Sequence, residues 1–307
     1  MSLGKRLINS SDSGGAGGGE DGKYMIISNG AGRTAARSSD GGATWTSTNV
    51  GVNVFGTAIS GTGQYQYFTA SNDGIYRSND YGATFTKTSV VKNWLDVATD
   101  HTGQYVIACD YAQVFRSTDY GASFSLVIAS VTNGRLCFSG NGQYAYHIAE
   151  TGSVKRSANG GASWSSISVG SGARKGDVSY DGKYVRIAYW NSNSVFALST
   201  NYGVSFPTTS SSYGMDVALN NSGQFQFQKG FSAVSYYSTD FGATNNSLPF
   251  STTVSCAYNG SGSKLIQGND RAPYLLLSED NGVTSTGLTV PITGQITSVS
   301  LNKLYTP

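Results

Sequence analysis

Seven side chains are candidates for binding chemistry in this sequence: three carboxylates, one guanidinium group and three large aromatic rings. They are Asp96, Asp177, Asp216, Arg135, Trp94, Trp190 and Tyr213. Aromatic faces stack on pyranose rings, while carboxylates and guanidinium groups hydrogen-bond sugar hydroxyls. If the fold gathers these side chains, they predict a ligand-binding site suited to a carbohydrate. The alternative reading is that the three aspartates only solvate a water-filled channel.

The residue sets that mark common catalytic and metal sites are absent from the sequence. There is no nucleophile elbow, phosphate-binding loop or metal-ligand spacing. The two histidines, His101 and His147, are expected to be ordinary turn and strand residues, and the three cysteines are expected to be buried free thiols. Two carboxylates about 5–9 Å apart could still hydrolyse a glycoside, and Glu150 together with the three aspartates leaves that open. We expect no enzymatic activity, no cofactor and no metal.

Two short motifs repeat along the chain with the same spacing. The elements that they mark must position the seven candidate residues. The first, which we call the Ser/Asp turn, reads Ser-x-Asp/Asn-x-Gly-x-Ser/Thr, and an aromatic residue follows it in the first five copies. Its third position falls at residues 40, 80, 119, 159, 201, 240 and 280. The second, which we call the Gly-Tyr turn, reads Gly-Gln/Lys-Tyr and begins at Gly22, Gly63, Gly103, Gly142, Gly182, Gly223 (with Phe for Tyr) and, in degenerate form, Gly262. A shared period of about 40 residues indicates a repeat architecture.

The Ser/Asp turn resembles the Asp-box, or BNR, repeat of sialidase-like propellers, and the resemblance covers roughly residues 22 to 302. It implies a turn between the third and fourth strands of a four-stranded blade. In such a turn Asp accepts backbone N–H groups, Gly permits a positive φ angle and the aromatic ring anchors the turn. The turns are therefore expected to be structural. Sialidases also carry an Arg-Ile-Pro motif, and the nearest string here begins at Arg186.

The predicted fold is an all-β, seven-bladed propeller of four-stranded antiparallel blades. Alternating apolar runs are short and bounded by Gly, Asn, Asp and Ser, and helical patterns are nearly absent. The first repeat lacks an inner strand, whereas residues 295–302 match the inner-strand pattern of residues 216–220. The C-terminal strand is therefore predicted to complete the first blade. Residues 1–20 are expected to form a flexible or docking segment, and residues 21–307 the propeller.

The irregular loops opposite the two repeated turns are the expected binding surface, because function concentrates in variable loops. They contain Glu150, Arg174, Lys175 and Arg271 as well as the three candidate aromatic residues. Counting seven residues back from each Gly-Tyr glycine predicts the lining of the channel mouth: Gly56, Asp96, Arg135, Asp216 and Ser255, with Asp177 by pattern and Ser298 from the closing strand. Trp94, Trp190 and Tyr213 are expected to be exposed around it.

Composition excludes several classes of partner. Twenty Lys and Arg face eighteen Asp and Glu, for a net charge of +2, and no basic stripe appears. A dedicated nucleic-acid binder would be expected to carry one. No apolar stretch approaches the ~18 residues needed to cross a bilayer, and the N-terminus has no signal-peptide pattern. We expect no nucleic acid and no membrane insertion.

The first nine residues, followed by a Ser/Gly-rich tract, resemble the start of tail-fibre and other appendage proteins of bacteriophages. This resemblance implies a virion protein that docks to other virion proteins through residues 1–20 and recognises host-surface carbohydrate. A lectin-like propeller unrelated to virions, working in the cytoplasm or outside the cell, is the alternative. A glycosidase is a second alternative.

Overall fold

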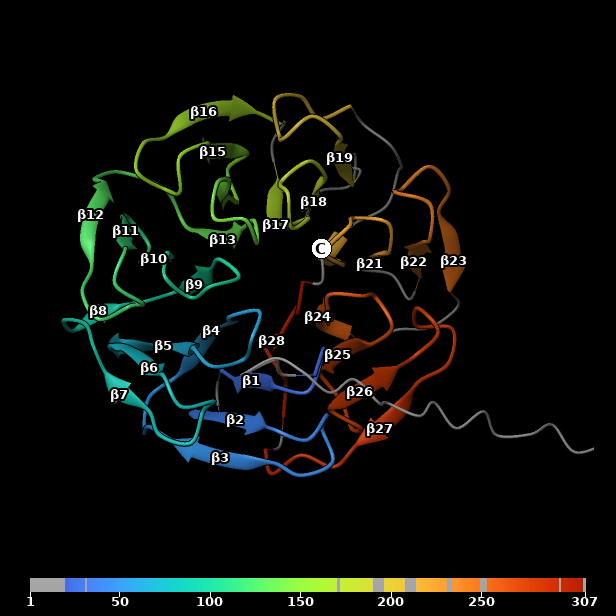
Figure 1. Cartoon of the computed structure of the whole chain (residues 1–307), viewed down its shortest axis with the longest axis horizontal. Coiled ribbons are helices and arrows are strands. Elements are labelled where there is room, and N and C mark those ends of the chain that lie inside the picture. The colour runs from blue at the N-terminus through green and yellow to red at the C-terminus, as the bar shows by residue number, and fades with distance from the viewer. Residues whose placement is uncertain are drawn as a thin grey trace, which may run out of the picture.

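The computed structural model describes residues 20–30, 32–169, 172–189, 196–207, 214–230, 234–248, 253–292 and 294–305. Within these residues every regular element is a β-strand, and the strands form seven sheets arranged around a central axis (Figure 1). The predicted seven-bladed propeller is confirmed. The expected docking segment, residues 1–20, lies outside the described residues except for Glu20.

The first four blades are antiparallel sheets whose strands follow one another from the axis outward. Blade 1 contains β28 (Ser298–Leu301), β1 (Met25–Asn29), β2 (Thr34–Ser38) and β3 (Thr46–Asn49). Blade 2 contains β4 (Val54–Ile59), β5 (Gln66–Asp73), β6 (Ile75–Ser78) and β7 (Thr86–Lys87), with β8 (Lys92–Asn93) also paired to β5. Blade 3 contains β9 (Asp96–Thr99), β10 (Val106–Cys109), β11 (Val114–Ser117) and β12 (Ser125–Ile128). Blade 4 contains β13 (Gly134–Phe138), β14 (Ala145–Ala149), β15 (Ser153–Ser157) and β16 (Ser165–Ser168).

The remaining three blades follow the same plan. Blade 5 shows three strands among the described residues: β17 (Ala173–Val178), β18 (Val185–Tyr189) and β19 (Ala197–Ser199). Blade 6 contains β20 (Gly214–Leu219), β21 (Gln226–Gly230), β22 (Ser235–Ser238) and β23 (Asn246–Leu248). Blade 7 contains β24 (Thr253–Tyr258), β25 (Leu265–Asn269), β26 (Leu275–Ser278) and β27 (Thr286–Leu288).

The C-terminal strand closes the ring as predicted. Strand β28 pairs antiparallel with β1, placing Leu301 opposite Met25 and Ser298 opposite Ser28. The apolar cluster around this junction joins Val299 and Leu301 to buried residues of blade 7, including Ile266. Blade 1 is therefore built from the two ends of the propeller, and its core is shared with blade 7.

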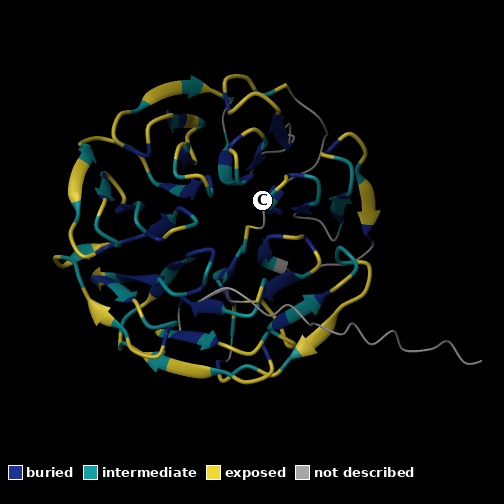
Figure 2. Cartoon of the chain, viewed as in Figure 1, coloured by how far each residue is buried: buried dark blue, intermediate teal, exposed yellow. Residues whose placement is uncertain are grey.

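The hydrophobic core lies between neighbouring blades. The second strand of each blade is buried along its length or nearly so, whereas the outermost strands are exposed (Figure 2). One core cluster, for example, joins Ile107 and Cys109 of blade 3 to Leu136 and Phe138 of blade 4. Because each blade packs on both faces, its second strand is buried even where it carries polar residues, as in β21 with Gln226, Gln228 and Lys229.

The Ser/Asp turns are hydrogen-bonded as expected for structural turns. In blade 2, Ser78 Oγ donates to Asp80 Oδ1 at 2.7 Å and accepts the N–H of Gly82 at 2.8 Å. The two oxygens of Asp80 accept the N–H and the hydroxyl of Thr84 at 2.9 and 2.6 Å. Asn159 replaces Asp in blade 4 and makes the equivalent bonds to the next Ser/Thr position, with its Nδ2 donating.

The two repeated motifs contact each other across neighbouring blades, which explains why they repeat in step. The ring of the Gly-Tyr turn stacks on the aromatic residue inside the next blade's Ser/Asp turn: Tyr65 on Tyr120 at 4.7 Å and Tyr144 on Tyr202 at 5.2 Å between centroids. Tyr120 and Tyr202 both adopt a φ of 61°, in the left-handed region. That strained conformation points each ring at the neighbouring blade.

A belt of backbone hydrogen bonds joins the turns between first and second strands around the ring. At 2.8–3.0 Å, N–H groups donate to carbonyls of the next blade: Gly61 to His101, His101 to Gly140, Asn141 to Tyr180, Tyr180 to Asn221 and Asn221 to Gly260. Asp21 continues the belt by accepting the N–H of Gly260 at 2.7 Å. Asn302 completes it by donating through Nδ2 to the carbonyl of Gly61 at 3.1 Å.

Blade 6 replaces the aromatic anchor of its turn with a polar one. Asn245 stands where the aromatic residue would be, and its Oδ1 accepts a hydrogen bond from Arg186 Nη2 at 2.9 Å. Arg186 is completely buried, and burial lowers its pKa to about 9. The arginine of the string nearest to the sialidase motif is therefore part of the inter-blade packing and faces no ligand site.

Deleting residues 295–307 should prevent formation of a stable ring. The deletion removes β28, exposes the β1 edge and opens the core cluster shared by blades 1 and 7. We expect an aggregated product without a cooperative thermal transition, measured by size-exclusion chromatography and differential scanning calorimetry. A control lacking only residues 306–307 should melt cooperatively. A soluble, cooperatively melting 295–307 deletion would disprove closure by β28.

The Ser/Asp turns should make stability fall in acid. Hydrogen bonds lower the pKa of Asp40, Asp80, Asp119 and Asp240 from 3.8 to about 2. Because these pKa values are depressed on folding, their contribution is present above pH 4 and is lost as the pH falls toward 2. Asp80→Asn should therefore make the melting temperature depend less on pH in acid. We expect a difference of less than about 1 kcal/mol in unfolding free energy, because this carboxylate is close to solvent.

The natural Asn turns provide the matched control for this measurement. Asn159→Asp should add a stabilising contribution at pH 7 that disappears below pH 4, since the neighbouring Ser157 and Ser163 donors are already in place. Identical pH profiles of the melting temperature for the wild type and both variants would show that the turn carboxylates do not contribute.

Candidate binding site at the channel mouth

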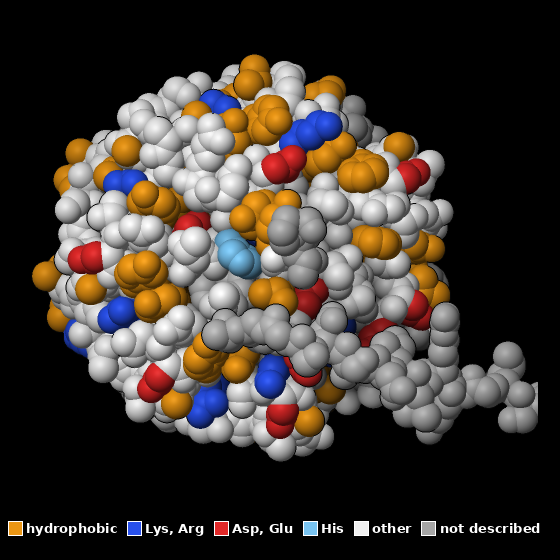
Figure 3. All heavy atoms as spheres, in the orientation of Figure 1, with side chains coloured by type: hydrophobic (Ala, Val, Ile, Leu, Met, Phe, Trp, Pro, Cys, Tyr) orange, Lys and Arg blue, Asp and Glu red, His pale blue; other side chains and the backbone are white. Residues whose placement is uncertain are grey.

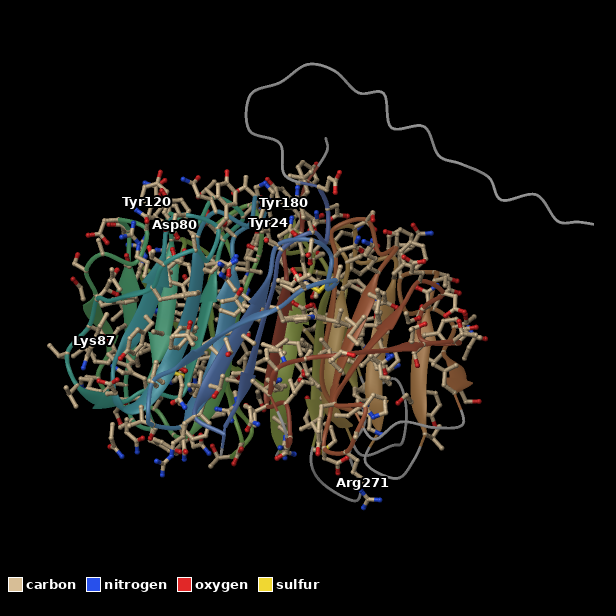
Figure 4. The ribbon with its side chains drawn as sticks, turned by 90° about the horizontal axis from the view of Figure 1, so that it is seen from below. Tyr24, Asp80, Lys87, Tyr120, Tyr180 and Arg271 are labelled. Atoms are coloured by element: carbon tan, nitrogen blue, oxygen red, sulfur yellow. The ribbon has the colours of Figure 1, made fainter. Side chains whose placement is uncertain are left out.

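The propeller has two unlike faces, seen from the side in Figure 4. Tyr24, Asp80, Tyr120 and Tyr180 lie on one face, which we call the turn face because it carries both repeated turns. Arg271 lies on the opposite face, which we call the mouth face. Figure 3 looks onto the turn face, where charged and apolar side chains are interspersed and no large field of one kind appears. Arg271, from one of the irregular loops, thus lies on the face opposite the repeated turns, as the sequence predicted.

Two cavities follow each other along the central channel. The mouth cavity, of about 180 Å3, lies at the strand starts, and the inner cavity, of about 190 Å3, extends toward the turn face. Asp96, Lys175 and Ser298 line both cavities. The channel is therefore divided at the level of these three side chains.

The segment after β28 covers the turn-face end of the inner cavity. The Lys303 carbonyl accepts a hydrogen bond from His101 Nδ1 at 3.1 Å, and the ring of Tyr305 stacks on Tyr180 with centroids 3.8 Å apart. The Leu304 carbonyl accepts a hydrogen bond from Asn221 Nδ2 at 2.9 Å. In Figure 1 this segment runs to the centre of the ring. The mouth cavity is therefore the better candidate for a ligand that enters from solution.

All seven blades contribute to the mouth cavity, each through the first three residues of its inner strand or the residues just before it. The lining is Gln295, Thr297 and Ser298 from blade 1, Phe55 and Gly56 from blade 2, Leu95 and Asp96 from blade 3, Arg135 from blade 4, Arg174 and Lys175 from blade 5, Met215 from blade 6 and Val254 from blade 7. The site therefore exists only once the ring has closed.

The lining contains three cationic side chains and one carboxylate, and one of the cations, Lys175, is paired with Asp216. Arg135, Arg174 and Lys175 come from the adjacent strands β13 and β17, and Asp96 is the carboxylate among the lining residues. Burial lowers the pKa of Arg174, the negative charge of Glu150 raises it, and smaller effects come from Arg135, which lowers it, and Asp216, which raises it. Arg174 therefore lies near two carboxylates as well as near Arg135.

The three candidate aspartates bridge blades through backbone groups. Asp96 accepts the N–H of Val97 at 3.0 Å and that of Leu136, in the next blade, at 2.9 Å. Asp216 accepts the N–H of Cys256 in the next blade at 3.1 Å and the Lys175 ammonium at 2.7 Å. Burial raises the pKa of Asp96, while the positive charge of Arg135, the two N–H donors and the charge of Lys175 act in the opposite direction. These contacts explain the aspartates on the inner strands better than a role in solvating the channel.

Asp177 does not lie at the mouth, where the repeat pattern placed it. It lines the inner cavity and accepts the N–H of Leu219 at 2.8 Å and the Lys303 ammonium at 2.9 Å. The turn of blade 5 keeps the common spacing, so the residue seven before Gly182 is Lys175. Asp177 lies two residues further along the strand and therefore deeper in the channel. Asp216 also lines the inner cavity, whereas Asp96 and Arg135 line the mouth as predicted.

Trp94 is not an exposed aromatic residue at the mouth. Its side chain is 1% exposed and packs edge-on against Phe115 with centroids 5.1 Å apart, while its Nε1 donates to the carbonyl of Val90 at 3.0 Å. The loop before β9 folds back so that the ring completes the core between blades 2 and 3. Trp190 and Tyr213, the other two aromatic candidates, lie outside the described residues.

Phe55, Lys175 and Met215 line the mouth but were not among the seven candidates. Phe55 and Met215 each precede a predicted mouth or strand position by one residue, and Phe55 is the aromatic side chain among the lining residues. A strict count of seven residues back from Gly182 would have found Lys175. Nothing in the sequence around Phe55 or Met215 distinguishes them from other apolar residues at strand starts.

His147 and the three cysteines are buried in the described part of the chain. His147 is completely buried, and burial lowers its pKa to about 4. Burial raises the pKa of all three free cysteine thiols well above the ordinary value. No group of three or more His, Cys, Asp or Glu side chains that could hold a metal occurs among the described residues. The same residues contain no helix that could span a membrane.

Comparison with known proteins places the chain by fold. Neither the protein-family models nor the curated proteins gave a sequence match. Solved structures with similar folds include the GH74 xyloglucanase of Xanthomonas campestris, with 15% identity, a TM-score of 0.65 and coverage of 94% of this chain and 55% of that one. The Niastella koreensis GH74 enzyme has 16% identity, a TM-score of 0.58 and coverage of 81% and 42%. YCF48 bound to D1 peptide has 13% identity, a TM-score of 0.61 and coverage of 80% and 87%.

These neighbours share the β-propeller fold with the chain. At such identities the likeness extends to the fold alone, and the chain spans about half or less of the two GH74 enzymes. The same fold is therefore found in enzymes and in a protein bound to a peptide. The choice between an enzymatic and a binding role must therefore be argued from the residues that line the mouth cavity.

Trp94→Ala should destabilise the protein without changing the mouth. Truncating a buried aromatic side chain costs about 3–5 kcal/mol, measured here as a loss of unfolding free energy in a urea titration. Tyr111→Ala is the control, because Tyr111 is 43% exposed and its loss should cost less than about 0.5 kcal/mol. Full stability of Trp94→Ala would contradict the buried position of the ring.

Proposed function

We propose that this propeller is a non-catalytic binding module that holds a surface carbohydrate in the mouth cavity, as part of a virion appendage. The observation that carries the proposal is the composition of the mouth, where every blade contributes to one cavity of about 180 Å3. Apolar side chains (Phe55, Leu95, Met215 and Val254) and polar or charged ones (Gln295, Thr297 and the cations) share the lining. Mixed apolar and hydrogen-bonding walls are the composition of small-ligand sites.

The use of the channel carboxylates supports binding over catalysis. Asp96, Asp177 and Asp216 have six carboxylate oxygens, and each oxygen accepts at least one hydrogen bond from the protein. A general acid or nucleophile must present an oxygen to the substrate within hydrogen-bond reach. Carboxylates held by the backbone of two blades are better suited to fixing the blades.

The geometry of the chain suits attachment through its N-terminal segment. Asp21 is fixed on the turn face by the N–H groups of Gly260 and Leu304 at 2.7 and 3.1 Å. A virion partner bound to residues 1–20 would therefore hold the propeller from the turn face and leave the mouth face directed away from the particle. The resemblance of the first nine residues to bacteriophage appendage proteins is the reason for naming a virion.

Filling the mouth should weaken carbohydrate binding. Met215→Trp places a larger side chain in the mouth cavity, and we expect a loss of about 1–3 kcal/mol of binding free energy, the range for a disturbed contact of hot-spot size. Binding would be measured on a glycan array with the intact chain and then by titration. Thr86→Trp on the exposed strand β7 is the control and should bind normally. Normal binding by Met215→Trp would place the carbohydrate elsewhere.

The virion assignment has its own test. Mass spectrometry of purified phage particles from a culture that produces this chain should detect it, and removal of residues 1–20 should eliminate it from the particles while the propeller still melts cooperatively. Absence of the full chain from the particles would leave a lectin-like propeller outside virions as the function.

A further inference from the structure

We infer that the turn-face end of the inner cavity is a binding site for a small primary alkylammonium ion, which the chain fills with its own Lys303. Residues 303–305, which we call the plug, occupy this end of the channel and exclude an external amine while they are in place. The inference is independent of the carbohydrate proposed for the mouth cavity, because it concerns the opposite end of the channel.

The two acceptors of the Lys303 ammonium are the first observation. Its Nζ donates to Asp177 Oδ2 at 2.9 Å and to the carbonyl oxygen of Leu219 at 2.8 Å. The side chains of Lys303 and Asp177 are only 27% and 22% exposed, so water and salt screen this pair less than one on the open surface. Charge-assisted hydrogen bonds of this kind are stronger than neutral ones. A carboxylate and a carbonyl so placed would hold an alkylammonium ion as they hold Lys303.

The balance of charge in the inner cavity is the second observation. Its lining includes four carboxylates and two ammonium groups, those of Asp96, Asp100, Asp177, Asp216, Lys175 and Lys303. Lys175 is bound by Asp216, whereas Lys303 is bound by Asp177. If Lys303 left, Asp177 would lose this ion pair while Lys175 stayed with Asp216. A partly buried carboxylate that loses its cation costs free energy, which favours replacement by another cation.

The separation of the plug from the closing strand is the third observation. The pairing of β28 with β1 and the apolar cluster at this junction both end at Leu301. The plug instead contacts blades across the channel: the Lys303 carbonyl accepts a hydrogen bond from His101 in blade 3, and the Leu304 carbonyl accepts one from Asn221 in blade 6. The plug can therefore leave the channel while β28 keeps the ring closed.

The size of the cavity limits the ligand to a small amine. The inner cavity has a volume of about 190 Å3, whereas a single water needs only ~10–15 Å3 and larger ligands occupy ~300–1,000 Å3. Lys303 lies two residues after β28, and a ligand on so short a tether has an effective concentration on the order of millimolar. An external amine should therefore bind the wild type weakly and a variant without the Lys303 ammonium more strongly.

Chemical rescue of Lys303→Ala tests the inference, because n-propylammonium matches the atoms that this substitution removes. Thermal unfolding of the intact chain would be measured with about 100 mM n-propylammonium chloride. We expect the melting temperature of Lys303→Ala to rise by about 2 °C and that of the wild type by less than half as much. Tetramethylammonium has the charge but no N–H donor, and 1-propanol has the carbon chain but no charge. Neither should raise the melting temperature of the variant.

Two further variants locate the rescue. Asp177→Asn in the Lys303→Ala background should eliminate it, because the charged acceptor is lost. Lys87→Ala is the matched control, since Lys87 pairs with Asp73 beside the exposed strand β7, away from the channel (Figure 4). Propylammonium should change its melting temperature no more than that of the wild type.

Gly260→Ala provides an independent route to the open site if Lys303→Ala fails to fold. A β-carbon at Gly260 would clash with the carbonyl oxygen of Leu304, so this substitution should displace the plug while Lys303 and Asp177 are unchanged. Propylammonium should again raise the melting temperature more than in the wild type.

Two results would overturn the inference. No rise for folded Lys303→Ala would show that the site does not bind an external ammonium ion. An equal rise with tetramethylammonium, or a rise that persists after Asp177→Asn, would reveal a general salt effect. Either result leaves the carbohydrate function to its own test, because the glycan array measures binding at the mouth.

Discussion

Closure of the ring is the constraint on which the rest of this structure depends. Each blade buries its faces only against its two neighbours, so an open array would leave two apolar blade faces and two strand edges exposed. Pairing of β28 with β1 removes both edges and assembles blade 1 from residues almost the whole chain apart. The hydrogen-bond belt on the turn face passes through Asp21 and Asn302 at this same junction.

Closure also explains why the two faces differ. On the turn face, Gly-Tyr rings, Ser/Asp turns and backbone belt residues all contact the neighbouring blade, so their identities are tied to a repeated geometry. Substitutions there must preserve a contact on each side, as Asn245 does by binding Arg186 in place of an aromatic ring. The strand starts on the mouth face have no such repeated partner, and seven blades place seven different side-chain sets around one cavity.

Charge is used differently at the two ends of the channel. At the turn-face end Lys303 is bound by Asp177 and by the carbonyl of Leu219, so the cation is matched within the protein. At the mouth both oxygens of Asp96 accept backbone N–H groups, one from Val97 in its own blade and one from Leu136 in the next. A channel aspartate therefore holds the C-terminal segment at one end and joins two blades at the other.

The sequence by itself determined the fold. The period of about 40 residues and the match of residues 295–302 to an inner strand sufficed for the blade number and the closing strand, because a repeat carries its structural pattern locally. Arg135 and Asp96 could also be placed in the mouth, since their distance from the Gly-Tyr glycine is set by strand geometry. The tertiary structure alone decided the burial of Trp94, the depth of Asp177 and the presence of Phe55 and Met215 in the lining. Those outcomes depend on how loops fold back and how strands from different blades meet, and such packing across seven blades leaves no periodic signal in the chain.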